Sequence, residues 1–199
     1  VLHLSEKRGW RKGLWIGYHQ MGTCYHYKSE YSNALSNYEK AISICDLHES
    51  EIMLDNARAA REVWKAGTLN NIGLIYTSLG DYPKALEYHL QSLSLKEKNG
   101  EPVVKDNINI ANIYNHTSDF FKALKYYQTA LQMASDANDT DNKLIALSNL
   151  GSVYYKQKNY SKALKLYFQS LILAEQSGDK NLISERLGNI GLVYGDQKD

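Results

Sequence analysis

The stretch Ala146–Leu164 decides the fold, and it reads ALSNLGSVYYKQKNYSKAL. In it Gly151 is followed by Tyr154, then by a second aromatic residue at Tyr160, and then by Ala163-Leu164. The same skeleton occurs in three other complete copies and in a fifth, truncated copy, so the chain is an array of repeats. The five copies are Gly22, Tyr25, Tyr31, Ala34-Leu35; Gly73, Tyr76, Tyr82, Ala85-Leu86; Ala111, Tyr114, Phe120, Ala123-Leu124; Gly151, Tyr154, Tyr160, Ala163-Leu164; and Gly191, Tyr194.

The composition is that of a helical globular protein. The 199 residues are 43% hydrophobic and 23% charged, only two are proline, and no alternating runs typical of strands occur. The net charge of +1 gives no sign of binding to nucleic acid or to an anionic membrane. No apolar run approaches the ~20 residues that cross a bilayer, and the first residues do not form a signal peptide. We expect a cytoplasmic protein.

Each copy is predicted to form two antiparallel helices, the first with Gly and Tyr and the second with Ala-Leu. In the fourth copy we expect helices at Asp141–Gln157 and Tyr160–Ser177, with Gly178 in the left-handed conformation past the helix end. Pro83 suits the first turn of its helix. The small residues let paired helices approach closely, and stacking buries the apolar stripe that one pair alone would expose.

The first step between copies is longer than the others. Tyr25 and Tyr76 are 51 residues apart, whereas the later steps are 38, 40 and 40 residues. The extra segment Asp46–Lys65 has no glycine or proline, and about 11 added residues make about three whole helical turns. We therefore predict one long helix from Glu49 to Ser78. The alternative is a small loop that absorbs part of the excess.

We predict one continuous array. Gly9 lies 13 residues before Gly22, and Gly178 lies 13 residues before Gly191. The start of the chain therefore matches the segment before Gly178, which is the end of a second repeat helix. We therefore expect a segment of a longer protein, whose exposed end faces could mediate homodimerisation. The predicted parts are the end of a preceding repeat helix (1–9), repeat 1 (10–48), repeat 2 with its extended first helix (49–99), repeat 3 (100–137), repeat 4 (138–178) and the first helix of a truncated repeat 5 (179–199).

The pattern resembles the tetratricopeptide repeat, in a longer variant of about 40 residues. Repeats of kinesin light chain and of bacterial peptide-sensing and sensor regulators are similar. The resemblance implies an all-α fold, a right-handed α-solenoid of stacked antiparallel helix pairs, and a protein or peptide partner. It departs from the usual pattern at Ala111, which replaces glycine, and at Ser92 and Ser170, which replace alanine. Copy one keeps the motif at Tyr18, Met21, Gly22, Tyr25, Ala34, Tyr38 and Ala41.

An amide side chain recurs in every copy, two residues before the array position. The array position is the first residue of the repeat skeleton, which is glycine in four copies and Ala111 in the third. Two residues of a helix are about 200° apart, so this amide faces away from a glycine in the helix–helix seam. In tetratricopeptide repeats this face lines the concave groove. Because a carboxamide both donates and accepts hydrogen bonds, we predict a ladder of amides that holds the backbone of an extended peptide. The alternative is that the amides bond neighbouring helices or hold water between repeats. The five residues are Gln20, Asn71, Asn109, Asn149 and Asn189.

Four further residues are predicted to line the same groove. They lie about one or two turns along the same helix face, at Asn112, Ser152, His26 and Tyr155. Few residues predicted on this face are strongly charged. We therefore do not expect the lysine-rich clamp with which some members of the family bind a C-terminal carboxylate.

No catalytic motif accompanies the repeats, and we expect no cofactor and no metal. His19 and His26 share a helix face, but Cys24 is rotated off it and the four converging ligands of a zinc site are missing. The acidic turn 136–141 lacks the glycine and the distal glutamate of a calcium loop, so a capped, solvated turn is the better interpretation. No phosphate-binding, hydrolase or kinase motif is present. Cys24 and Cys45 are expected to be free thiols.

Three functions follow from the sequence, none of them enzymatic. The first is an interaction scaffold that binds an extended peptide or partner segment. The second is the ligand-sensing region of a larger bacterial signalling protein, such as a sensor kinase, nucleotide cyclase or transcription regulator. The third is self-assembly alone. Replacing Asn109 and Asn149 with alanine should weaken ligand binding under the first two and leave it unchanged under the third.

Overall fold

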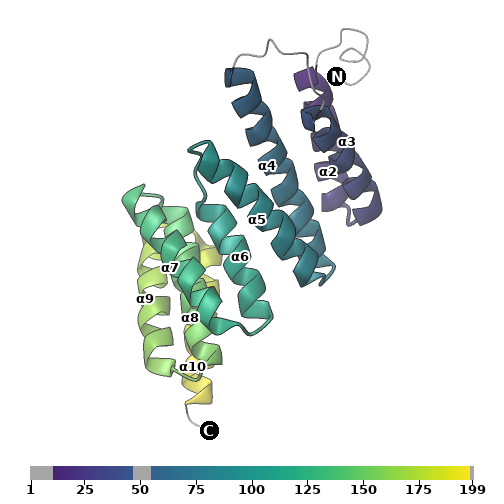
Figure 1. Cartoon of the computed structure of the whole chain (residues 1–199). Coiled ribbons are helices and arrows are strands. Elements are labelled where there is room, and N and C mark those ends of the chain that lie inside the picture. The colour runs from purple at the N-terminus through teal and green to yellow at the C-terminus, as the bar shows by residue number, and fades with distance from the viewer. Residues whose placement is uncertain (1–10, 47–54, 198–199) are drawn as a thin grey trace. The chain divides into compact units, whose positions relative to one another are not determined.

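The computed structural model describes residues 11–46 and 55–197, and every regular element within them is a helix (Figure 1). No helix of this described part is long and apolar enough to cross a membrane. The all-α prediction is confirmed. The helices are α2 (Arg11–Tyr27), α3 (Tyr31–Asp46), α4 (Asp55–Ser78), α5 (Tyr82–Lys98), α6 (Val104–His116), α7 (Phe120–Asp136), α8 (Thr140–Lys156), α9 (Tyr160–Ser177) and α10 (Lys180–Asp196).

Consecutive helices pack against each other in pairs. Figure 1 shows α2 beside α3 and α4 beside α5, and α3 also contacts α4. Farther along the chain, α8 packs on α9, with α7 against α8 and α10 against α9. The described chain divides into two compact units, of which the first ends at Asp106 and the second begins at Asn107, within α6. Each unit is a stack of antiparallel helices, as the repeat pattern predicts.

The two units have cores of the same construction. Each core combines small residues and rings of a second helix with β-branched residues of the following first helix, all of them buried. This shared burial joins one repeat to the next. The core residues include Ala34, Tyr38, Ile72 and Ile75 in the first unit, and Ala163, Tyr167, Leu171, Ile190 and Val193 in the second.

The turn between the two helices has the same geometry in the four complete copies. One residue takes a positive φ. The N–H of the next residue donates a hydrogen bond to the carbonyl oxygen of the skeleton tyrosine of the same copy, as Asn159 N does to Tyr154 O at 2.8 Å. Asn159 then caps α9 by accepting the N–H of Lys162 at 3.3 Å. The residues with positive φ are Ser29 (60°), Gly80 (75°), Ser118 (61°) and Lys158 (59°).

The predicted ends of the fourth repeat agree closely with the structure. The helix expected at Asp141–Gln157 is α8, shifted by one residue, and α9 has the predicted bounds. Gly178 follows α9 with a φ of 72°. Pro83 lies in the first turn of α5. Asp139 in the acidic turn caps α8 through the N–H of Asn142, so the prediction of a capped turn is confirmed.

The helix α4 is the longest that the structure describes, with 24 residues. The predicted long helix is confirmed from Asp55 to Ser78, and the predicted part from Glu49 to Leu54 lies outside the described residues. The expected helix end at residues 1–9 lies outside them as well. The extra turns carry charged side chains, and Arg58 pairs with Glu62 one turn along at 3.3 Å.

Candidate functional site

In three copies an aromatic ring of the second helix lies directly on the array glycine. A Cβ atom on any of these glycines would come within 2.6–2.8 Å of the ring, and only glycine permits such an approach. The ring residue always follows the array position by 16 residues, and this spacing was a signal that the sequence analysis did not use. The pairs are Gly22 with Tyr38, Gly73 with His89, and Gly151 with Tyr167.

The ring hydroxyl of the first copy bonds the residue after the array position. Tyr38 Oη lies 3.1 Å from Thr23 Oγ1. Thr23 donates its single proton to His19 O at 3.0 Å, so Tyr38 is the donor. The polar side chain of Thr23 therefore holds the ring of its own repeat in place.

Two predicted groove residues make the same kind of bond in the second unit. Tyr127 Oη donates to Asn112 Oδ1 at 2.5 Å. Burial raises the pKa of Tyr167 to about 12, and a hydrogen bond to Ser152 acts in the opposite direction. Asn112 and Ser152 thus anchor rings of their own repeats, in addition to any role toward a ligand.

Two of the predicted groove residues meet across neighbouring first helices of the second unit. Asn149 Nδ2 on α8 donates to Asn112 Oδ1 on α6 at 3.1 Å. This bond fixes the amino end of the Asn149 side chain, and its carbonyl oxygen has no hydrogen bond from the described residues. Asn109 and Asn189 are half-buried at the matching positions of α6 and α10.

In the first unit the corresponding amide meets a histidine. Asn71 Nδ2 lies 3.3 Å from His19 Nε2, and His19 Nδ1 lies 3.1 Å from Thr68 Oγ1. Thr68 donates its only proton to Trp64 O at 3.0 Å. His19 Nδ1 must then be the donor to Thr68, which leaves Nε2 to accept from Asn71. Burial lowers the pKa of His19, in keeping with this neutral form.

Aromatic rings surround His19. Its ring centroid lies 5.0 Å from that of Trp15 and 5.5 Å from that of Tyr38. Trp15 stacks on Trp64 at 5.3 Å and donates Nε1–H to Thr68 at 3.1 Å. These contacts join α2 to α4, so His19 has a structural role. In the described part of the chain, no group of three or more His, Cys, Asp or Glu residues is arranged to hold a metal ion.

The remaining predicted groove residues do not join these clusters. Gln20 is exposed on α2, and the His26 ring lies 5.9 Å from that of Tyr31. Burial lowers the pKa of His26. Tyr155 Oη donates to Asp196 Oδ2 at 2.7 Å, which joins α8 to α10, and this carboxylate raises the pKa of Tyr155.

Copy two has a buried polar cluster that the sequence analysis missed. His89 Nδ1 bonds Asn70 Oδ1 at 3.0 Å, and burial lowers the His89 pKa to about 4, so the ring is neutral. Ser92 Oγ donates to Asp106 Oδ1 at 2.9 Å, and Lys96 Nζ donates to Asp106 Oδ2 at 2.7 Å. The Asp106 side chain is fully buried, and the positive charge of Lys96 compensates it.

Family models of the tetratricopeptide repeat match most of the chain. One matches residues 17–46, a second matches 66–99, and a third matches 106–176 and 143–199. A comparison with curated protein sequences gave no match.

Several solved structures share the fold at low sequence identity. The apo form of RapI is 19% identical with a TM-score of 0.77, and the match covers 92% of this chain and 64% of that chain. BtubC (BKLC) from P. vanneervenii is 20% identical with a TM-score of 0.73, and the match covers 89% of this chain and 70% of that one. A Rap protein complexed with Competence and Sporulation Factor is 17% identical with a TM-score of 0.73, covering 93% and 49%. The chain thus spans about two thirds of the first Rap structure and half of the second.

The repeat skeleton, the paired helices and the matching family models agree, and the chain belongs to the tetratricopeptide repeat family.

Proposed function

We propose that this chain is a protein–protein interaction module that binds an extended peptide or partner segment along the amide-bearing faces of its first helices, without catalysis. The observation that carries the proposal is the orientation of Asn149. Its amino group is held by Asn112 at 3.1 Å, whereas its carbonyl oxygen has no hydrogen bond from the described residues. An amide held at one end and open at the other is a ready contact for a ligand.

The chemistry of these amides matches a peptide backbone. The oxygen and second N–H of Asn149 offer one acceptor and one donor, which is the complement of a peptide group. Asn71, Asn109 and Asn149 are half-buried, so their side chains lose less conformational freedom when a ligand binds. Within one unit, neighbouring first helices ~9 Å apart and an extended chain rising ~3.3 Å per residue would give one contact for about three ligand residues. Such contacts bind a peptide with little dependence on its sequence.

The fold comparison is compatible with a binding role. One similar structure is a Rap protein complexed with Competence and Sporulation Factor. At 17% identity the similarity supports the fold alone, so the assignment of peptide binding to this chain rests on its own amides.

The proposal is tested with peptides recovered from a display library panned against the chain. Their affinities are measured by titration calorimetry on the wild type and on the double variant Asn109→Ala, Asn149→Ala. Loss of two carboxamide contacts should weaken binding about tenfold to a hundredfold.

The matched control is Gln176→Ala, since Gln176 is an exposed amide on α9, which is a second helix. This variant should bind as the wild type does. Circular dichroism and thermal unfolding establish that each variant is folded. A folded double variant with wild-type affinity for every recovered peptide would refute the proposed site.

A regulatory region of a larger signalling protein is the second candidate. It is favoured by the length of the match, since the chain spans 64% of RapI and 49% of the second Rap structure. In such a protein, occupancy of the array would control an adjoining output domain such as a kinase, cyclase or transcription regulator. The sequence of the parent protein distinguishes this function from that of a separate binding module.

A further inference from the structure

An apolar pocket of the second unit, here called the α7–α9 pocket, is formed by residues of α7, α8 and α9. Its volume is about 600 Å³, which is in the range of small-molecule sites. Its apolar side chains are Leu131, Leu147, Ile172 and Leu173. All its lining residues belong to the second unit, and none is a predicted groove residue. The pocket is therefore separate from the proposed peptide surface.

One lysine, Lys143 of α8, is the only charged residue that lines the α7–α9 pocket. It is half-buried, and its side chain has no hydrogen bond or ion pair with the residues that the structure describes. Two nearby carboxylates have other partners, since Gln132 donates to Asp136 at 2.7 Å and Asn142 donates to Asp139 at 2.6 Å. A half-buried ammonium group has lost part of its water, so an anion beside it is favoured.

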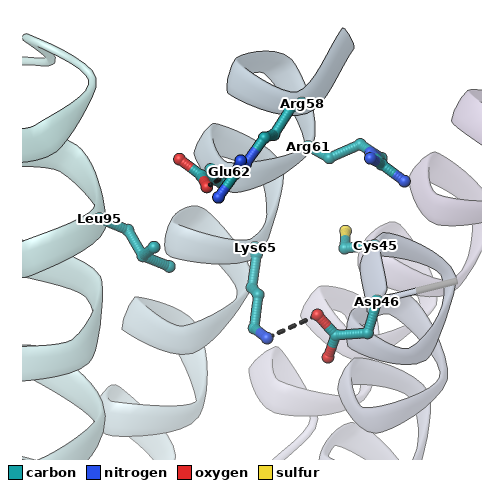
Figure 2. Close-up of a pocket in the computed structure, with 7 residues that line it drawn as sticks. All are labelled: Cys45, Asp46, Arg58, Arg61, Glu62, Lys65 and Leu95. Carbon is teal, nitrogen blue, oxygen red and sulfur yellow. Dashed lines mark hydrogen bonds and ion pairs between the residues drawn. The ribbon is translucent and has the colours of Figure 1, made fainter. Parts of the chain in front are cut away.

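A pocket of the first unit, drawn in Figure 2, shows lysines whose charge is met within the chain. It has a volume of about 410 Å³. Lys65 Nζ lies 2.6 Å from Asp46 Oδ1, and Lys98 Nζ lies 2.8 Å from Glu62 Oε1. Residues of α3, α4 and α5 line this pocket, among them Cys45, Arg61 and Leu95.

The repeat register relates Lys143 to the paired lysine Lys65. Each lies eight residues before the array position of its copy. The partner of Lys65, Asp46, lies 24 residues after the array position of copy one, and Ser135 lies 24 residues after that of copy three. Ser135 lines the α7–α9 pocket together with Lys143. The second unit thus has the lysine, but a hydroxyl group stands where the first unit has the carboxylate.

The walls around the two lysines correspond as well. A trough of the first unit and the α7–α9 pocket are lined by the same residue types at four equivalent positions of copies two and four. These pairs are Lys65 and Lys143, Leu69 and Leu147, Gln91 and Gln169, and Leu95 and Leu173. The missing carboxylate is therefore a difference between two otherwise similar surfaces.

We propose that the α7–α9 pocket binds a medium-chain aliphatic carboxylate, with its carboxylate on Lys143 and its alkyl chain along Leu131 and Leu147. The ligand supplies the charge that Asp46 supplies in the first unit, through a charge-assisted hydrogen bond. Gln128 and Ser135 both line the pocket and are seven residues apart on α7, which is ~10 Å along the helix. Each methylene group buried there contributes about fourfold in affinity.

Four probes test the proposal by titration calorimetry on the chain, below the concentrations at which they form micelles. They are octanoate, butanoate, octan-1-ol and octyltrimethylammonium. Octanoate should bind, and butanoate should bind at least about tenfold more weakly because it buries fewer methylene groups. Octan-1-ol should also bind about tenfold more weakly, since it lacks the charge. The cationic probe should not bind.

A charge variant establishes that binding occurs at this pocket. Lys143→Gln should weaken octanoate about tenfold or more. Lys165→Gln removes one charge from an exposed position on α9 that does not line the pocket, and it serves as the matched control. This control should bind octanoate as the wild type does. Thermal unfolding establishes that each variant is folded.

A second pair of variants tests the comparison between the two units. Ser135→Asp introduces a carboxylate at the position of Asp46, so it should pair with Lys143 and weaken octanoate about tenfold or more. Ser135→Asn has nearly the same shape without the charge and should retain binding. Failure of octanoate to bind, equally tight binding of octan-1-ol or the cationic probe, unchanged affinity in Lys143→Gln, or equal affinities of the two Ser135 variants would overturn the assignment.

Discussion

Gly151 lies in the middle of α8, where glycine weakens a helix by about 1 kcal/mol relative to alanine. The ring of Tyr167 explains why glycine is nevertheless present. A Cβ atom at residue 151 would come 2.7 Å from that ring. The close approach of α8 and α9 therefore outweighs the helix preference at this position.

Gly151→Ala should destabilise the chain by about 1–3 kcal/mol, because the new methyl group overpacks the ring. The matched control is Gly188→Ala in α10, where no described atom beyond the neighbouring residues and the local helix backbone lies within 4 Å of the added Cβ. That variant should be more stable by about 0.5–1 kcal/mol, since alanine favours the helix. Urea unfolding measures both values. A Gly151→Ala protein as stable as the wild type would contradict the packing argument.

His89 makes the stability of the first unit depend on pH. Burial lowers its pKa to about 4, whereas an exposed histidine titrates near 6.5. Among the charged groups around the ring, Asp106 raises this pKa and Lys96 lowers it. As the pH falls from about 6.5 to about 4, the unfolded chain binds a proton that the folded chain does not. The stability is therefore complete above this range and falls by up to about 3 kcal/mol across it.

His89→Tyr should remove this loss, since the other three complete copies have tyrosine at this position. Unfolding free energies of the variant and the wild type are compared at neutral pH and near pH 4.5. The difference should shift in favour of the variant by roughly 2 kcal/mol at the lower pH. Contributions from groups that do not interact with residue 89 cancel in this comparison. A difference that does not change with pH would show that His89 is not held neutral.

Sequence reasoning located polar residues but not all of their partners. Asn112 and Ser152 were predicted from helical phase to line a groove, and their hydrogen bonds run to Tyr127 and Tyr167. Helical phase gives the direction in which a side chain leaves its helix. It does not report whether the ring of a second helix reaches that side chain first.

Among the elements, the short turn within each repeat places one residue in the left-handed region. Lys158 has a φ of 59°, which costs a residue with a Cβ about 1–2 kcal/mol. Lys158→Gly should stabilise the chain by about 0.5–1 kcal/mol, after allowance for the greater freedom of glycine in the unfolded state. Lys158→Ala is the control, because it removes the same side chain without relieving the backbone. Thermal unfolding compares the two, and equal stability would contradict the prediction.

The buried ion pair between Lys96 and Asp106 joins α5 to the start of α6. Lys96→Met should destabilise the chain by about 3–5 kcal/mol, because it leaves the Asp106 charge buried without its partner. Adding Asp106→Asn should recover most of this loss. Chemical unfolding of the wild type, the two single variants and the double variant forms a double-mutant cycle. If Lys96→Met costs as much in the Asp106→Asn background as in the wild type, the pair does not account for the effect.

Helix ends were predictable because their signals are local. Pro83, Asn159 and Gly178 each fix the backbone within one turn of their own position, and the length of α4 followed from counting whole turns. The pocket at Cys45, Arg61 and Leu95 was not predictable, because three helices contribute to it. Which lysine pairs with which carboxylate there depends on how these helices pack, and sequence spacing does not contain that information.

At the scale of the whole molecule, the repeat pattern was sufficient to predict an all-α fold of the tetratricopeptide type. The same-phase amides were the signal for the candidate site. Two of them, Asn71 and Asn149, bond a neighbouring first helix, which was the alternative considered for this ladder. Under the proposed function, a peptide binds the polar atoms of these amides that the helix–helix bonds leave available. The repeat boundaries and the groove residues stay predictions.

A crystal structure of the chain with a display-selected peptide tests the central claim most directly. The account predicts a backbone N–H of the peptide within about 3 Å of Asn149 Oδ1, with the bond between Asn149 and Asn112 retained. A peptide that contacts neither Asn109 nor Asn149, or that is held through its side chains alone, would contradict the account.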